Sequence, residues 1–292
     1  MRIVSLLPST TEILFAIGAG DDVVGVTFEC DHPAEARNRR IVSTSAMPTG
    51  LSSSEIDAFV AAAMARGDDL YHLDAGALAE LDADLVVTQD LCAVCAVDVS
   101  VVDDALAHLG CRAEVLTIDP HTLEEVLDSV VVLGRSTGHE GAATAHVAAL
   151  RERVARVRTA VAGRTAPRVA VLEWTDPPYA PGHWVPDMIG LAGGMDVLGR
   201  AGEKSVQVHR SSVLEATPDV VVCAPCGYDL EGALPLARAA LDWLPEDVPV
   251  WAVDANGSFA RPGPRLVDGV EALAAILQPG ALPSSAIAAQ VR

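Results

Sequence analysis

Short, continuously apolar runs recur along the chain and are separated by longer segments with helical character. The runs are rich in Val, Ile and Leu and cover residues 3–7, 23–26, 85–87, 115–118, 169–172, 220–223 and 250–253. Apolar runs of this length that do not alternate with polar residues are typical of strands covered on both faces. Because strand and helix alternate, the pattern favours an α/β class with largely parallel sheets.

Two of the predicted helix starts have the spacing of a capping box. Ser9 stands three residues before Glu12 and precedes Ile13, and Ser52 stands three residues before Glu55. In this motif a Ser or Thr hydroxyl and a Glu or Gln three residues later satisfy backbone N–H groups at the helix start. We therefore expect helices to begin close to Ser9 and Ser52.

Residues 140–162 contain no Pro and have Gly141 as their single interior Gly. Apolar side chains recur there at spacings of three and four, at Val147, Leu150, Val154, Val157 and Val161. The pattern predicts one amphipathic helix of roughly 20 residues, about 30 Å long. A coiled-coil seam is the alternative, but two heptads are too few to favour it.

This long helix divides the chain. We predict an N-terminal α/β lobe at 1–137, a linking backbone helix at 138–165, a C-terminal α/β lobe at 166–280, and a tail at 281–292 that is frayed from Pro283. The lobes resemble each other, since LDADLVVTQDLC and ATPDVVVCAPC both place an Asp before a Val-rich strand that leads to a cysteine. In open α/β sheets ligands bind beyond the carboxyl ends of the strands. We therefore expect one ligand cleft between the lobes.

Composition narrows the possible partners. A chain of 292 residues suits two domains, and 50% hydrophobic with 21% charged residues indicates a folded, core-rich protein. The net charge of −20 argues against binding to nucleic acid or to an anionic membrane. No run approaches 18 apolar residues, so no membrane span is expected. Polar residues from Pro8 to Glu12 interrupt any secretory signal, and we expect a cytoplasmic protein.

The six cysteines are candidates for metal or redox chemistry, because disulfides are rare in a reducing compartment. Cys223 lies inside a Val run and Cys111 lies between a helix and a strand, which suits buried core positions. Four thiols remain on loops at strand ends: Cys30, Cys92, Cys95 and Cys226. Such a set suits a tetrahedral Zn²⁺ or an iron–sulfur cluster. Reduced structural thiols, or a redox C-x-x-C pair, are the alternatives.

Aromatic residues make up only 4% of the chain, yet Trp174, Tyr179 and Trp184 fall in one stretch, EWTDPPYAPGHWVPDMIGLAGG (173–194). Its prolines prevent a helix before residue 185. A stiff loop with aromatic faces that directly follows a strand suits stacking on a flat ligand. Asp176 and His183 are its polar candidates, and an imidazole can donate a hydrogen bond or bind a metal. A loop whose tryptophans cover the edge of the core is the alternative.

A second candidate ligand loop is DANGSFARPGPR (254–265), which carries Phe259 and Arg261. An arginine there could hold an anionic or amide group with two hydrogen bonds, and a surface arginine is the alternative. The chain contains no G-x-G-x-x-G, Walker, H-E-x-x-H or G-x-S-x-G sequence. Nucleotide binding is therefore weakly supported, and the sequence leaves open whether the protein is an enzyme.

Several segments together resemble the vitamin B12/iron-siderophore substrate-binding protein family, over residues 1 to about 278. They are RIVSLLPSTTEILFAIGAGDDVVGVT, ADLVVTQ and RPGPRLVDGVEALAAIL. The resemblance implies the class III periplasmic-binding-protein-like fold, with two Rossmann-like lobes and mostly parallel sheets joined by one long rigid helix. ECD, QDLCAVCAV, EWTDPP, GHWVP and PCGYDL are similar to a leaderless, cobalamin-binding-like subgroup. The resemblance loosely implies that aromatic residues in the cleft, Trp174, Trp184 and Phe259, hold the ligand.

We expect a cytoplasmic protein that binds a corrinoid or another metal-bearing cofactor between its lobes, stacked on Trp174 and Trp184 and fixed at its rim by His183 and Arg261. Without an export signal, an ABC-transporter partner is not expected. The rival hypothesis is an iron–sulfur or zinc protein or enzyme, with the four cysteine ligands, that acts on a small molecule. A docking module that kept the fold and lost the ligand is the third.

Overall fold

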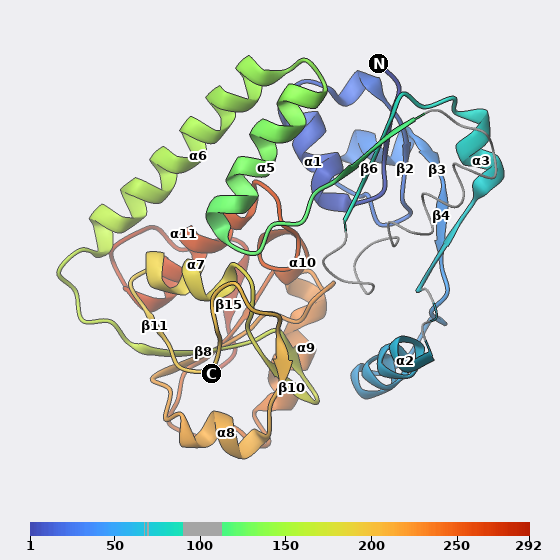
Figure 1. Ribbon diagram of the computed structural model, residues 1–292. Helices are drawn as coiled ribbons and strands as arrows, with labels where there is room; N and C mark the ends of the chain where they lie inside the picture. Colours follow the sequence, from blue (N-terminus) through green and yellow to red (C-terminus); the bar gives the residue numbers. More distant parts are fainter. Residues whose placement is uncertain (67, 69, 90–112) are drawn as a thin grey trace. The chain divides into compact units, whose positions relative to one another are not determined.

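A computed structural model describes residues 1–66, 68, 70–89 and 113–292 of the chain (Figure 1). The chain forms two compact units. Unit 1 comprises Met1–Pro120 and Leu127–Val147, and unit 2 comprises His121–Val126 and Ala148–Arg292. Each unit is built on its own five-stranded sheet.

Unit 1 is built on a parallel sheet with the strand order β3-β2-β1-β6-β7. Its strands are β1 (Ile3–Ser5), β2 (Val23–Val26), β3 (Arg40–Ile41), β6 (Leu85–Thr88) and β7 (Glu114–Thr117), and β4 (Ser43–Ser45) and β5 (Tyr71–Leu73) form a separate antiparallel pair. Its helices are α1 (Pro8–Ala16), α2 (Ser53–Arg66), α3 (Ala75–Glu80) and the short 3-10 helices η1 (Gly20–Asp22) and η2 (Ala34–Asn38). Helices α5 (Leu123–Ser136) and α6 (Glu140–Val161) contribute residues to both units.

Unit 2 is built on a sheet with the order β11-β8-β13-β14-β15, in which β15 alone is antiparallel to its neighbour. The strands are β8 (Arg168–Leu172), β11 (Met195–Asp196), β13 (Val220–Cys223), β14 (Val250–Val253) and β15 (Ala288–Gln290). A smaller antiparallel sheet joins β9 (Trp174–Thr175), β10 (Pro178–Ala180) and β12 (Val206–Gln207). The helices are α7 (Val185–Leu191), α8 (Arg210–Glu215), α9 (Leu230–Ala240), α10 (Ala255–Ser258) and α11 (Leu266–Leu277).

The core of unit 2 forms because its central strands are apolar on both faces. Leu172 and Val221 belong to the face that packs against Ala233 and Ala237 of α9. On the opposite face, a Cβ at Gly194 would touch Val169 of β8 and Leu277 of α11, so α7 and α11 cover that side (Figure 1). Each fully buried Val or Leu contributes roughly 1.5–3 kcal/mol to folding. Burial on both faces explains why the strands do not alternate apolar with polar residues.

The two sheets share a topology. In unit 1 the order β2-β1-β6-β7 is parallel throughout, and β11-β8-β13-β14 is the same arrangement in unit 2. Strand β6 carries the LDADLVVT segment and β13 carries ATPDVVVC, so these similar segments occupy equivalent strands. The chain therefore uses one α/β arrangement twice.

All seven predicted strands are present. The helix predicted from the spacing of apolar residues in 140–162 is observed as α6. Of the five spaced residues, Val147, Leu150, Val157 and Val161 are buried along it, and Val154 is half-buried. Helix α2 begins directly after Ser52, whose backbone N–H and hydroxyl both donate to Glu55 Oε2, at 2.8 and 2.7 Å. The helix start predicted there is confirmed.

The helix start expected close to Ser9 is confirmed, but the capping box proposed for it is wrong. Helix α1 begins at Pro8, whose fixed φ suits the first helical position, and its N-cap is Leu7. The hydroxyls of Thr10 and Thr11 donate to the carbonyl of Leu7, at 3.2 and 3.0 Å. Pro8 thus starts the helix earlier than the Ser-to-Glu spacing indicates.

The expectation of a frayed tail is also wrong. Strand β15 pairs antiparallel with β14, and Val250 and Arg292 are joined through the Val250 N–H and the Arg292 carbonyl, at 3.1 Å. The guanidinium of Arg292 donates to the carbonyls of Pro245 and Val248. The tail covers an otherwise open sheet edge, which a composition-based reading of a terminus does not detect.

Deleting residues 286–292 should therefore lower the free energy of unfolding by about 2–5 kcal/mol, because several edge hydrogen bonds are lost. Urea denaturation followed by circular dichroism measures this, and Arg292→Ala should account for only part of the loss. An unchanged urea midpoint in the deletion variant would show that β15 adds no stability.

Candidate functional site

The carboxyl ends of β8 and β13 form the natural ligand edge of unit 2. After β8 the chain goes to β11 on one side, and after β13 it goes to β14 on the other side. Such a switch point leaves a crevice where open α/β sheets bind ligands. The two exits stay together, because the Ala224 N–H donates to the Leu172 carbonyl at 2.8 Å and the Cys226 N–H to the Glu173 carbonyl at 3.0 Å.

The aromatic segment, residues 173–184, leaves this edge as a hairpin rather than as an irregular loop. Strand β9 pairs with β10, with Trp174 opposite Tyr179, and β10 pairs with β12. The indole N–H of Trp174 donates to the carbonyl of Asp176 at 3.0 Å. The hairpin therefore fixes the Trp174 ring close to the end of β8.

Trp174 meets Tyr228, whose ring centroid is 5.8 Å away at an interplanar angle of 51°. Both residues are half-buried. The carbonyl of Tyr228 accepts the N–H groups of Ala255 and Asn256, at 3.1 and 2.9 Å, so the turn after β14 joins the same place. Three strand-end segments thus surround two partly exposed rings, which can offer a flat ligand a stacking surface.

Tyr228 and Asn256 were not among the site residues that the sequence analysis selected. The available signals were position, because Tyr228 stands two residues after the strand-end Cys226 in the PCGYDL motif and Asn256 lies in the second candidate ligand loop. Their meeting with Trp174 depends on strand order, which the sequence alone did not specify.

Trp184 and Phe259 lie inside unit 2 and are only 4% and 2% exposed. The indole N–H of Trp184 donates to the carbonyl of Phe259 at 2.7 Å, which satisfies its polar atom away from water. In this structure neither ring offers an open face for the stacking that the sequence analysis assigns to it. The pair instead anchors the end of the aromatic segment to the turn after β14.

Other predicted polar residues lie around this edge. His183 has a φ of 48°, in the left-handed region, and its half-buried ring lies 6.1 Å from that of His121. Asp176 is exposed and pairs with Arg210 at 3.1 Å, an arrangement worth little in water. Arg261 is half-buried, and its carbonyl accepts the N–H of Gly263 at 2.8 Å. Their assignment as ligand contacts, like that of Tyr179, stays a prediction.

Glu173 is an ionisable residue that the sequence analysis did not select. Its Oε1 accepts the N–H of Gly182 at 3.2 Å, and its Oε2 accepts the hydroxyl of Ser205. Burial raises the pKa of this carboxyl to about 7, and the nearby carboxylate of Asp196 acts in the same direction. Near neutral pH the carboxyl therefore exists in both protonation states.

The cysteines divide between the units. Cys226 is exposed after β13, whereas Cys223 lies in the core, and burial raises the pKa of its thiol to about 12. The neutral Cys223 thiol suits the predicted packing role. In unit 1, Cys30 is buried after β2, and its sulfur is in hydrogen-bond contact with the hydroxyls of Thr11 and Thr27, at 3.1 and 3.2 Å.

Cys92 and Cys95, the other two predicted metal ligands, lie outside the described residues. Within residues 1–89 and 113–292, apart from 67 and 69, no group of three or more His, Cys, Asp or Glu side chains is arranged to hold a metal ion. The cysteine-ligated zinc or iron–sulfur site stays a prediction. Elemental analysis of the purified protein tests it directly.

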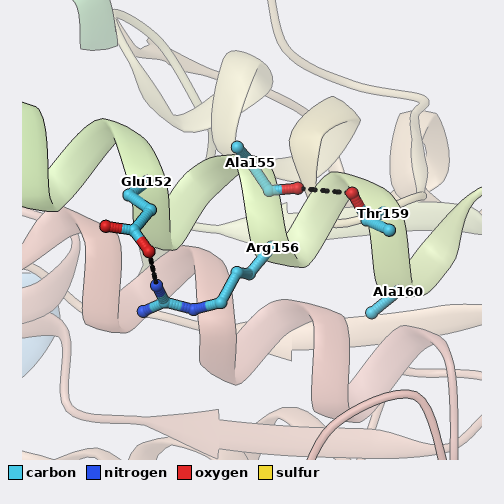
Figure 2. A pocket seen from close by; sticks show the side chains of 5 residues that line it. All are labelled: Glu152, Ala155, Arg156, Thr159 and Ala160. Carbon is cyan, nitrogen blue, oxygen red and sulfur yellow. Dashed lines mark hydrogen bonds and ion pairs between the residues drawn. The ribbon is translucent and has the colours of Figure 1, made fainter.

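A hollow of about 350 Å³ lies on an exposed face of α6 (Figure 2). Its polar groups are satisfied within the helix, since Arg156 pairs with Glu152 at 3.0 Å and the Thr159 hydroxyl donates to the Ala155 carbonyl at 2.9 Å. The lining offers no aromatic ring and no polar group directed at a ligand. We therefore place the candidate site at the sheet edge of unit 2.

None of the helices in the described part of the chain has the length and apolar composition that crossing a membrane requires.

Comparisons with known proteins agree on one family. Residues 3–235 match the family model of periplasmic binding proteins. A vitamin B12-binding protein of Yersinia pestis (strain Pestoides F) is 24% identical over 270 residues, which cover 91% of this chain and 82% of the relative.

Two solved structures show the same fold. A periplasmic vitamin B12-binding protein of Vibrio cholerae has a TM-score of 0.68 and 23% identity, and the match covers 95% of this chain and 96% of that one. A periplasmic heme-binding protein from Pseudomonas aeruginosa has a TM-score of 0.73 and 21% identity, with 99% and 97% covered. The predicted α/β fold class is confirmed, and at these identities the likeness establishes the fold alone.

The pKa of Glu173 predicts a pH-dependent stability. Because the folded state holds this proton more tightly than the unfolded chain, the contribution is fully present below about pH 4.5 and is lost as the pH rises through about 7. The free energy of unfolding of the wild type, minus that of Glu173→Gln, should fall by at most about 3 kcal/mol over this range. Urea denaturation at a series of pH values measures the difference. The exposed Glu203→Gln is the control, and parallel pH profiles for wild type and Glu173→Gln would contradict the assignment.

Proposed function

Because the chain belongs to the periplasmic binding protein family, in its vitamin B12 and siderophore branch, we propose that it binds a corrinoid at the sheet edge of unit 2. The observation that carries this proposal is the pair of half-buried rings, Trp174 and Tyr228, 5.8 Å apart where β8 and β13 end. A substrate-binding protein needs a surface that recognises its ligand without reacting with it, and aromatic faces provide one.

The proposed ligand class follows from chemistry that the relatives share. The names of similar proteins include vitamin B12 and heme, both of which are large, flat, metal-bearing macrocycles. A flat macrocycle covers a large apolar area when it stacks on aromatic rings, and each stacked pair adds about 0.5–1.5 kcal/mol beyond the buried area. Among these macrocycles we favour a corrinoid, because the curated relatives are vitamin B12-binding proteins.

The residues around the rings would hold the rim of such a ligand. Asp176, on the exposed part of the aromatic segment, and Arg210 of α8 present opposite charges, and amide groups of a corrinoid can bond to either. Cys226 is exposed beside this edge and could approach the metal of the cofactor. Arg261 and His183 are retained as candidates for the polar rim.

We propose separately that the protein is cytoplasmic, as the sequence analysis expects. The relatives named above include periplasmic proteins, whereas the expectation from the sequence is a cytoplasmic protein. Cell fractionation with an antibody against the native protein tests this proposal independently of the ligand.

Titration with hydroxocobalamin tests the corrinoid proposal. We expect saturable quenching of tryptophan fluorescence and a rise in melting temperature, because a ligand that binds only the folded state stabilises it. Trp174→Ala should weaken binding roughly 3- to 10-fold, in line with the loss of one stacked ring. Trp251→Phe is the control, since Trp251 lies within β14, opposite Gln290 of β15.

Two outcomes of this titration would contradict the corrinoid proposal. If hydroxocobalamin neither quenches the fluorescence nor raises the melting temperature, the corrinoid assignment is abandoned. Tighter binding of hemin than of hydroxocobalamin in the same titration would replace the corrinoid by a porphyrin.

A further inference from the structure

Glu173 connects three segments of unit 2 that lie apart in the sequence. It is the first residue after β8, and Trp174 follows it directly. Its carboxyl accepts the N–H of Gly182, at the far end of the aromatic segment, and the hydroxyl of Ser205, just before β12. One carboxyl group therefore ties both ends of the hairpin to the segment that faces it.

The facing segments are packed closely enough for this connection to be specific. A Cβ at residue 182 would overlap the backbone of Glu203, Lys204 and Ser205, so only glycine fits there. The next residue, His183, donates its N–H to the Glu203 carbonyl at 2.6 Å and accepts the N–H of Gly202 at 2.9 Å. The end of the aromatic segment is thus docked on residues 202–205 by two backbone hydrogen bonds of His183, in addition to the contacts of the Glu173 carboxyl with Gly182 and Ser205.

The backbone of Glu173 is fixed as well. Its N–H donates to the Tyr179 carbonyl at 3.1 Å, and its carbonyl accepts the Cys226 N–H at 3.0 Å. Since the backbone of Glu173 is held at the sheet and its side chain reaches residues 182 and 205, the hairpin between them has little freedom. Trp174, paired with Tyr179 in the hairpin, is held against Tyr228 as a consequence.

We propose that Glu173 is a positioning residue for ligand binding, which fastens the aromatic segment to residues 203–205 and so sets the orientation of the Trp174 ring. This inference rests on the proposed function, because it assigns a purpose to the same aromatic surface. A surface that is already ordered loses less conformational freedom on binding and therefore binds more tightly. The raised pKa of the carboxyl indicates that a neutral side chain of the same shape is tolerated at this position.

Hydrogen–deuterium exchange of the ligand-free protein tests the fastening by itself. In Glu173→Ala the amides of Gly182 and His183 should exchange about tenfold faster or more, because one loses its acceptor and the other its docked neighbour. Glu173→Gln keeps an acceptor for Gly182 and a partner for Ser205, so it should restore exchange to within about twofold of wild type. Glu203→Ala is the matched control, because it removes an exposed carboxylate of the facing segment that pairs with Arg200.

The same variants titrated with hydroxocobalamin test the consequence for binding. Glu173→Ala should weaken the affinity about tenfold, whereas Glu173→Gln and Glu203→Ala should match wild type. Weaker binding by Glu173→Ala, together with wild-type affinity in Glu173→Gln and in Glu203→Ala, would assign the loss to the hydrogen bonds of residue 173. If Glu173→Ala does not fold, Ser205→Ala removes the other partner of the carboxyl and should speed Gly182 exchange in the same direction.

The outcomes separate the two proposals. Wild-type protein that fails to bind hydroxocobalamin overturns the corrinoid function, and the exchange experiment still decides whether Glu173 fastens the segment. Unchanged exchange in Glu173→Ala, or exchange in Glu173→Gln as fast as in Glu173→Ala, overturns the positioning role.

Discussion

The parallel ladder between β8 and β13 places Leu172 beside Cys223, and the proposed function depends on this pairing. Two segments that leave adjacent parallel strands exit at the same edge, and here they stay joined because Ala224 and Cys226 donate back to Leu172 and Glu173. The pairing is stable because Val, Leu and Cys side chains of both strands are buried. Burial of the strands therefore positions the residues that follow them.

Burial also divides the aromatic residues by role. Trp184 and Phe259 are enclosed, and a hydrogen bond between them joins two strand-end segments. Trp174 and Tyr228 stand at the same edge but remain partly exposed. The enclosed rings pack within unit 2, whereas the partly exposed rings have surface available for the ligand proposed above.

Local pattern was sufficient to predict the strands and the long helix. Runs such as Val220–Cys223 reveal burial on both faces, and the spacing from Val147 to Val161 shows the apolar stripe of α6. The tail was missed because β15 has little apolar character of its own and is stabilised by pairing with β14. The helix start near Ser9 was predicted correctly, but the capping role of Ser9 was not, because Pro8 occupies the first position of α1.

The site was less accessible to sequence reasoning, since its contacts join distant segments. The sequence predicted ligand contacts for Trp174 and Trp184 alike, because it could not separate the partly exposed ring from the enclosed one. Tyr228 becomes notable only when β13 is placed beside β8, because its partner Trp174 lies 54 residues away. Glu173 becomes notable only when β12 is placed beside β10, because its partner Ser205 lies 32 residues away. The pair Cys92 and Cys95 lies outside the described residues, and its role rests on the sequence alone.

Hydroxyl-radical footprinting read by mass spectrometry, with and without hydroxocobalamin, tests the central claim most directly. A ligand at the carboxyl-end edge of β8 and β13 should protect Trp174 and Tyr228 from oxidation and leave Trp251, on β14 away from that edge, unchanged. Protection of other residues, with Trp174 and Tyr228 oxidised as readily as in the free protein, would place the ligand elsewhere and contradict the account.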